Sequence, residues 1–88
     1  GFVNEVVTAD KLMERTWELA RLVESGPPLV YAAIKEVVRE AENMKFLDGL
    51  KKITGSEFGT VETLYKSEDQ LEGARAFAEK RDPVWKGR

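Results

Sequence analysis

The sequence has 88 residues, of which 42% are hydrophobic and 34% charged, a composition typical of one small soluble domain built from amphipathic helices. Its formal charge of −2 gives no basic surface for a nucleic acid, and no apolar run is long enough to cross a bilayer. It contains neither cysteine nor histidine, which excludes disulfides, thiolate nucleophiles, zinc sites with Cys or His ligands and a Ser-His-Asp triad. Without a recognisable signal peptide, the chain is expected to be cytoplasmic, with no nucleic-acid or membrane partner.

The chain opens on a short β-rich run, residues 2–7, in which Phe2 and three valines surround a polar pair. Such a run predicts a strand, although no second strand is evident for it to pair with. Glu5 in this run is expected to be an ordinary solvated or structural carboxylate. The first residue is Gly1 rather than methionine, which indicates a piece of a longer protein.

The first helix is expected over residues 10–25, with Thr8 or Asp10 as its N-cap. Its apolar residues recur at helical spacing and are expected to form a buried stripe, which Trp17 widens. The stripe consists of Leu12, Met13, Thr16, Leu19, Ala20 and Val23. Gly26 and the prolines that follow it end this helix.

Pro27 and Pro28 suit the first turn of a second helix, because a proline there loses no intrahelical hydrogen bond. This helix is expected to run to about residue 42. Its apolar face consists of Val30, Ala33, Ile34, Val37, Val38 and Ala41. Lys35, on the opposite side, is most simply a surface lysine.

The helical rhythm continues through residues 46–66, but this segment contains three glycines. Each glycine costs about 1 kcal/mol relative to alanine inside a helix. The pattern therefore predicts either one bent helix or two pieces broken near Gly55 and Ser56.

The last helix is predicted to begin at Ser67, which forms a capping-box pattern with Gln70. Lys80 and Arg81 place positive charge in its last turn, and Pro83 prevents its continuation. One helical face carries Leu71, Ala74, Phe77 and Ala78. An extended tail with Trp85 and a basic end follows this helix.

Three pairs of glutamates have the spacing of one helical turn, and such pairs are candidates for general acid–base work. They are Glu14 with Glu18, Glu36 with Glu40, and Glu68 with Glu72. Each pair lies on a polar helix face, so ordinary solvation is the favoured interpretation. The sequence has no glycine-rich phosphate loop, and no catalytic residue or metal ligand is predicted.

The pattern SED..EG..AF.EKR.P.W.G, at residues 67–87, resembles the C-terminal signature of the crotonase (enoyl-CoA hydratase/isomerase) superfamily. The run FAEKRDPVWKGR at residues 77–88 is especially similar to the carnitinyl-CoA dehydratase subgroup. The opening GFVNEVV and the pattern GPPL....K, which ends at Lys35, resemble the same superfamily. This resemblance covers essentially the whole chain.

The resemblance implies an all-α fold of three to four amphipathic helices after a short N-terminal strand, equivalent to the C-terminal trimerisation region of a crotonase. It also favours a mostly continuous helix over residues 46–66. In such enzymes an upstream α/β core carries the catalytic groups, so residues 1–88 alone are expected to be inactive. The parent is expected to be a lyase, a hydratase or dehydratase that acts on a coenzyme A thioester and has no covalently bound cofactor.

Two positions carry over from the family as coenzyme A contacts. The resemblance implies that Phe77 packs against the coenzyme bound by a neighbouring subunit and that Lys80 meets its phosphate charge. Core packing of Phe77 and a helix-dipole role for Lys80 remain the alternatives. The family also implies a homo-oligomer, a trimer or hexamer. The alternative to an enzyme fragment is a non-catalytic helical oligomerisation or interaction module.

Overall fold

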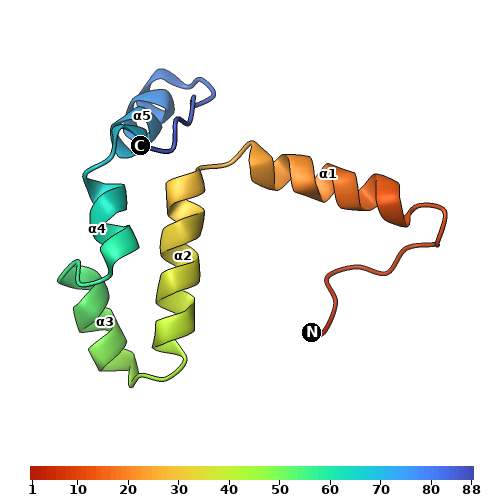
Figure 1. The fold of residues 1–88 in the computed structure, drawn as a ribbon. Coiled ribbons are helices and arrows are strands. Elements are labelled where there is room, and N and C mark those ends of the chain that lie inside the picture. The colour runs from red at the N-terminus through yellow and green to blue at the C-terminus, as the bar shows by residue number, and fades with distance from the viewer.

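The computed structural model describes all 88 residues and contains five helices and no strand (Figure 1). The helices are α1 (Leu12–Glu24), α2 (Pro28–Ala41), α3 (Phe46–Thr54), α4 (Gly59–Tyr65) and α5 (Glu68–Glu79). The expected all-α class is confirmed. The helix number exceeds the expected three to four because residues 46–66 form two helices. None of the five helices combines the length and apolarity needed to cross a membrane.

The small core lies where α2 runs beside α4 (Figure 1). Ala33 of α2 packs with Phe58 and Val61, and Phe58 is only 1% exposed. Val37 and Leu64 extend this cluster. The apolar face of α2 thus meets α4, although only Ala33 among its residues is fully buried.

Polar contacts around Phe58 fix α3 and α4 against α2. Glu36 accepts hydrogen bonds from the backbone N–H of Thr60, at 2.9 Å, and from the Thr60 hydroxyl. The Lys52 ammonium lies 4.8 Å from the Phe58 ring centroid and 3.0 Å from Glu40 Oε2. Because Lys52 belongs to α3 and Glu40 to α2, this ion pair links the two helices.

The segment that joins α3 to α4 breaks at the predicted place. Ser56 adopts a left-handed conformation, with φ 54°, directly after Gly55. The N–H of Ser56 donates to Ile53 O and the N–H of Glu57 to Lys52 O, the two bonds of a Schellman motif. The two-piece prediction is confirmed and the continuous helix is wrong, because this turn is what brings Phe58 into the core.

Helix α1 projects away from the other helices and contains no buried residue (Figure 1). The expected burial of its apolar stripe is therefore wrong for this chain, because no other helix packs closely against that face. Trp17 remains 58% exposed. Neither Thr8 nor Asp10 caps the helix: the N-cap residue is Lys11, and no side chain bonds there.

Residues 1–7 form neither helix nor strand, so the expected N-terminal strand is wrong. A strand needs a neighbour to accept its backbone hydrogen bonds, and these residues have none. Phe2 is fully exposed. Glu5 binds Arg15 Nε at 2.8 Å, which attaches the N-terminal segment to α1.

Candidate functional site

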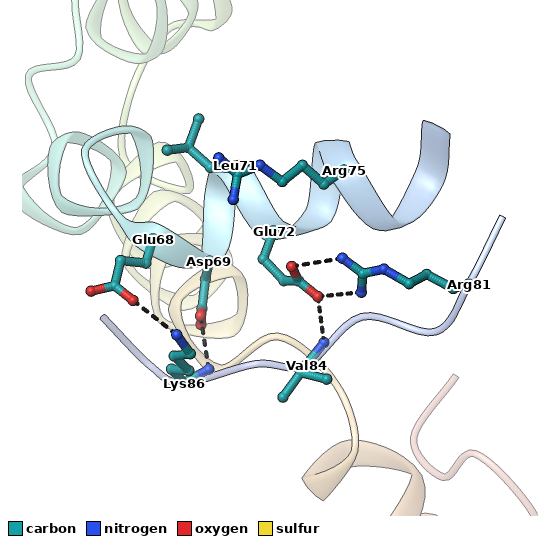
Figure 2. Close-up of a pocket in the computed structure, with 8 residues that line it drawn as sticks. All are labelled: Glu68, Asp69, Leu71, Glu72, Arg75, Arg81, Val84 and Lys86. Atoms are coloured by element: carbon teal, nitrogen blue, oxygen red, sulfur yellow. Dashed lines mark hydrogen bonds and ion pairs between the residues drawn. The ribbon is translucent and has the colours of Figure 1, made fainter. Parts of the chain in front are cut away.

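The last residues of the chain, 81–88, fold back along α5 instead of extending into solvent (Figures 1 and 2). They lie on a helix face formed by Asp69, Glu72, Gly73 and Ala76. The apolar face predicted from the sequence lies on the other side and is exposed; it carries Leu71, Ala74, Phe77 and Ala78. The polar face contacts the tail because the tail brings backbone N–H groups and cations that need acceptors.

Asp69 binds the end of the tail. Its side chain, in a residue only 3% exposed, accepts hydrogen bonds from the N–H groups of Lys86 and Gly87, both at 2.8 Å. Its own N–H donates to the carbonyl of Arg88 at 3.1 Å. Asp69 also lies in the first turn of α5, where the helix dipole favours negative charge.

Ser67 begins α5 as predicted, since its hydroxyl accepts a hydrogen bond from Gln70 N–H at 3.0 Å. This bond satisfies one of the N–H groups left free at the start of the helix. The cap fixes the start of α5 and therefore the position of Asp69 two residues later.

Glu72 binds the beginning of the tail. Arg81 donates to both of its carboxylate oxygens, through Nη1 at 2.6 Å and Nη2 at 3.0 Å, and the N–H of Val84 donates at 2.9 Å (Figure 2). The Arg81 guanidinium, followed by the Val84 N–H, lowers the pKa of Glu72 from its ordinary 4.5 to about 2. The hydrogen bonds that Arg81 donates to Glu72 and Glu79 raise the pKa of Arg81.

Trp85 fills the middle of the interface between the tail and α5. Its indole packs on Gly73, and it borders an apolar cavity of about 220 Å³. Besides Trp85, the cavity is lined by Pro27, Leu29, Val30, Leu64, Asp69, Gln70 and Gly73. The tail thereby connects α5 to the start of α2.

A groove of about 510 Å³ lies between α5 and the tail (Figure 2). It is lined by Glu68, Asp69, Leu71, Glu72, Arg75, Arg81, Val84 and Lys86. Its charges are largely paired within the chain. Lys86 binds Glu68 at 3.2 Å, and Lys86 and Arg88 together lower the pKa of that carboxylate.

Phe77 and Lys80, the two residues singled out from the sequence, lie outside this groove at the end of α5. Phe77 is 88% exposed, so the alternative that it packs in a core is wrong within this chain. Lys80 N–H donates to Phe77 O at 3.3 Å, which places the two residues within one turn. The Lys80 side chain is exposed and forms no ion pair within the chain. Both side chains are thus uncovered within residues 1–88.

Members of the three glutamate pairs with helical spacing bind partners within the chain. Glu14 binds Lys11 at 2.7 Å and Glu18 binds Arg15 at 2.7 Å. Hydrogen bonding from Thr60 lowers the pKa of Glu36. These carboxylates, which were expected to be solvated, thus also have partners within the chain.

Sequence reasoning missed the binding of the tail by Asp69 and Glu72. A signal for it was present, because two acids three residues apart face away from the apolar stripe. The tail that follows carries three cations, Arg81, Lys86 and Arg88. Glu72 was expected to be solvated, and the fold-back could not be read from local spacing.

Comparison with known proteins places this arrangement in a family. All of residues 1–88 match the family model described as enoyl-CoA hydratase/isomerase. The chain belongs to the enoyl-CoA hydratase/isomerase family, as the sequence resemblance implied.

Individual relatives agree with this assignment. The chain is 46% identical over 88 residues to the carnitinyl-CoA dehydratases of Salmonella heidelberg and Salmonella typhimurium, covering 100% of this chain and 34% of each relative. The crystal structure of an enoyl-CoA hydratase/isomerase from Mycobacterium paratuberculosis matches with a TM-score of 0.86 and 33% identity, over 100% of this chain and 33% of that one. The chain thus spans about a third of the length of these relatives.

Proposed function

We propose that residues 1–88 are the C-terminal helical region of an acyl-CoA hydratase or dehydratase of the carnitinyl-CoA dehydratase type. The whole protein would add or remove water across the α,β bond of a coenzyme A thioester. This region would contribute to subunit association and to one wall of the coenzyme site. The identity of 46% to carnitinyl-CoA dehydratases over the whole chain supports this reaction class.

The exposed end of α5 supports the coenzyme role. Phe77 offers an uncovered aromatic face, on which the adenine of coenzyme A can stack. Lys80, within the same turn, offers an unpaired ammonium for a phosphate group. An aromatic ring beside an unpaired cation thus suits an adenosine phosphate, since the ring can stack on the adenine and the cation can bind the phosphate.

The exposed apolar surface supports subunit association. Only 7 of 88 residues are buried, whereas large apolar side chains of α1 and α3 face solvent. Leu22 of α1 is 67% exposed and Phe46 of α3 is 80% exposed. Apolar surface of this extent is typical of a contact surface. We assign it to packing within a homo-oligomer, a trimer or hexamer as in the family.

The exposure of Phe77 and Lys80 together is the observation that carries the proposal. Its test is the rate of hydration of 2-enoyl-CoA thioesters by the whole protein as its gene encodes it. The proposal expects turnover, with Lys80→Ala raising KM about three- to tenfold and leaving kcat unchanged, as the loss of one exposed phosphate contact would. Lys51→Ala is the matched control, because Lys51 is an exposed lysine on α3. Absence of turnover would contradict the proposed reaction.

The alternative function is a non-catalytic helical oligomerisation or interaction module. The uncovered face of α1 favours it, because that face needs a partner whether or not coenzyme A binds. Sedimentation of the whole protein with and without coenzyme A separates the two functions. A discrete oligomer without affinity for coenzyme A would favour the module.

A further inference from the structure

The backbone at Lys80 has a conformation that L-amino acids rarely adopt. Lys80 ends α5 with φ 55° and ψ 43°, in the left-handed region. Its N–H donates to Phe77 O at 3.3 Å and the N–H of Arg81 donates to Ala76 O at 3.1 Å, the bonding of a Schellman motif. Glycine is the usual residue at this position because a side chain there is disfavoured. A lysine at this position therefore indicates that its side chain has a use.

Arg81 fixes the backbone directly after Lys80. Its guanidinium binds both oxygens of Glu72, and its Nε binds Glu79 at 2.6 Å. Glu72 lies two turns back along α5 and also accepts the N–H of Val84. Lys80 is thus fixed between the last turn of the helix and a residue tied back to that helix.

The same contacts leave the Lys80 ammonium available. Glu79 is the last residue of α5, and Glu72 lies two turns before it; Arg81 reaches both acids. Arg81 binds both of them and offsets part of their charge, and Lys80 forms no ion pair. Without this arrangement, the acids would compete with a phosphate for the ammonium.

We infer that Glu72, acting through Arg81, is a positioning residue that directs Lys80 toward a phosphate of coenzyme A. This inference rests on the proposed coenzyme contact. Neither Glu72 nor Arg81 needs to touch the coenzyme. Their role is to fix the Lys80 backbone and to keep its ammonium unpaired.

The test is Glu72→Gln in the whole protein, assayed with a coenzyme A thioester and with the matching pantetheine thioester, which lacks the phosphates. KM for the coenzyme A thioester is expected to rise about three- to tenfold, with kcat and the pantetheine reaction unchanged. Arg81→Lys keeps the charge but loses the bidentate contact with Glu72. It is expected to raise KM for the coenzyme A thioester less than Glu72→Gln does. Glu62→Gln is the matched control, because Glu62 pairs with Lys66 at 2.6 Å on another helix. Equal losses with both thioesters would indicate general disruption and overturn the inference.

Combination with Lys80→Ala separates this inference from the proposed function. If Glu72 acts through Lys80, Glu72→Gln has no further effect in the Lys80→Ala background. If Lys80→Ala raises KM and Glu72→Gln does not, positioning by Glu72 is refuted while the coenzyme contact stands. If Lys80→Ala has no effect, the contact itself fails and the inference falls with it. Melting curves of each variant check that the fold is retained.

Discussion

Trp85 lies against Gly73, where the absence of a side chain lets the indole approach the helix closely. A Cβ atom at residue 73 would lie 3.3 Å from Cη2 and 3.5 Å from Cζ3 of the indole ring. The ring therefore packs on the helix backbone itself. This contact, together with the bonds to Asp69 and Glu72, holds the tail along α5.

Gly73→Val is expected to displace Trp85. The branched side chain would overlap the indole, so the ring must move toward solvent and its fluorescence should shift to longer wavelength. Trp17, which is 58% exposed, also fluoresces, so the measurement belongs in a Trp17→Phe background. Gly49→Val is the control, because a Cβ at that glycine would meet nothing within 4 Å. An unchanged Trp85 spectrum in Gly73→Val would contradict the packing described.

Asp69→Asn is expected to release the end of the tail. Asp69 accepts the N–H groups of Lys86 and Gly87, and an amide replaces one acceptor oxygen with a donor. A hydrogen bond to a charged group contributes about 1.5–3 kcal/mol, so the exchange rates of these two amide protons should rise at least tenfold. Hydrogen exchange followed by NMR measures this. Asp82→Asn is the control, and equal protection in Asp69→Asn would count against the contact.

The attachment of the tail should weaken in acid. The pKa of Glu72 is lowered from its ordinary 4.5 to about 2, chiefly by Arg81. A carboxylate with a lowered pKa stabilises the folded form fully above its ordinary pKa, and this stabilisation is lost as the pH falls toward the lowered value. Between about pH 4.5 and pH 2, the NMR signals of Arg81 Nε–H and Val84 N–H should therefore move toward their unbonded positions. The same titration of Glu72→Gln should lack this transition, and a transition that persists there would assign it to another group.

Lys80→Gly is expected to make the fold more stable while it weakens coenzyme A binding. Glycine has no Cβ and adopts the left-handed conformation of this position more readily. The free energy of unfolding should therefore rise by about 1 kcal/mol. Thermal unfolding measures this gain, and Lys80→Ala should show none because alanine keeps the Cβ. Affinity for coenzyme A should fall in both variants. A stability gain without loss of affinity would show that the lysine is not retained for coenzyme binding.

The parts of the fold set by local sequence were predictable. The Ser67 cap, the prolines that begin α2 and the break at Gly55 each depend on residues close together in the chain. The apolar stripe of α1 was predicted, but periodicity alone could not reveal that no other helix of the chain packs closely against it. The N-terminal strand failed for the same reason, since a strand depends on a distant neighbour.

The coenzyme contact of Phe77 and Lys80 stays a prediction. Phe77 and Lys80 were identified by motif, and the structure places them within one turn with both side chains exposed. The binding of the tail was not predicted, because it joins Asp69 to residues 17 and 18 positions later. Contacts over that separation depend on the left-handed turn at Lys80. A lysine in the sequence does not predict such a turn.

The central claim is that the end of α5 contacts coenzyme A. Its most direct test is the dissociation constant of coenzyme A, measured by isothermal titration calorimetry on the whole protein and on its Lys80→Ala variant. We expect coenzyme A to bind and the variant to bind about three- to tenfold more weakly, with pantetheine unaffected. Equal affinities for coenzyme A in the two proteins, or no binding to either, would contradict the claim.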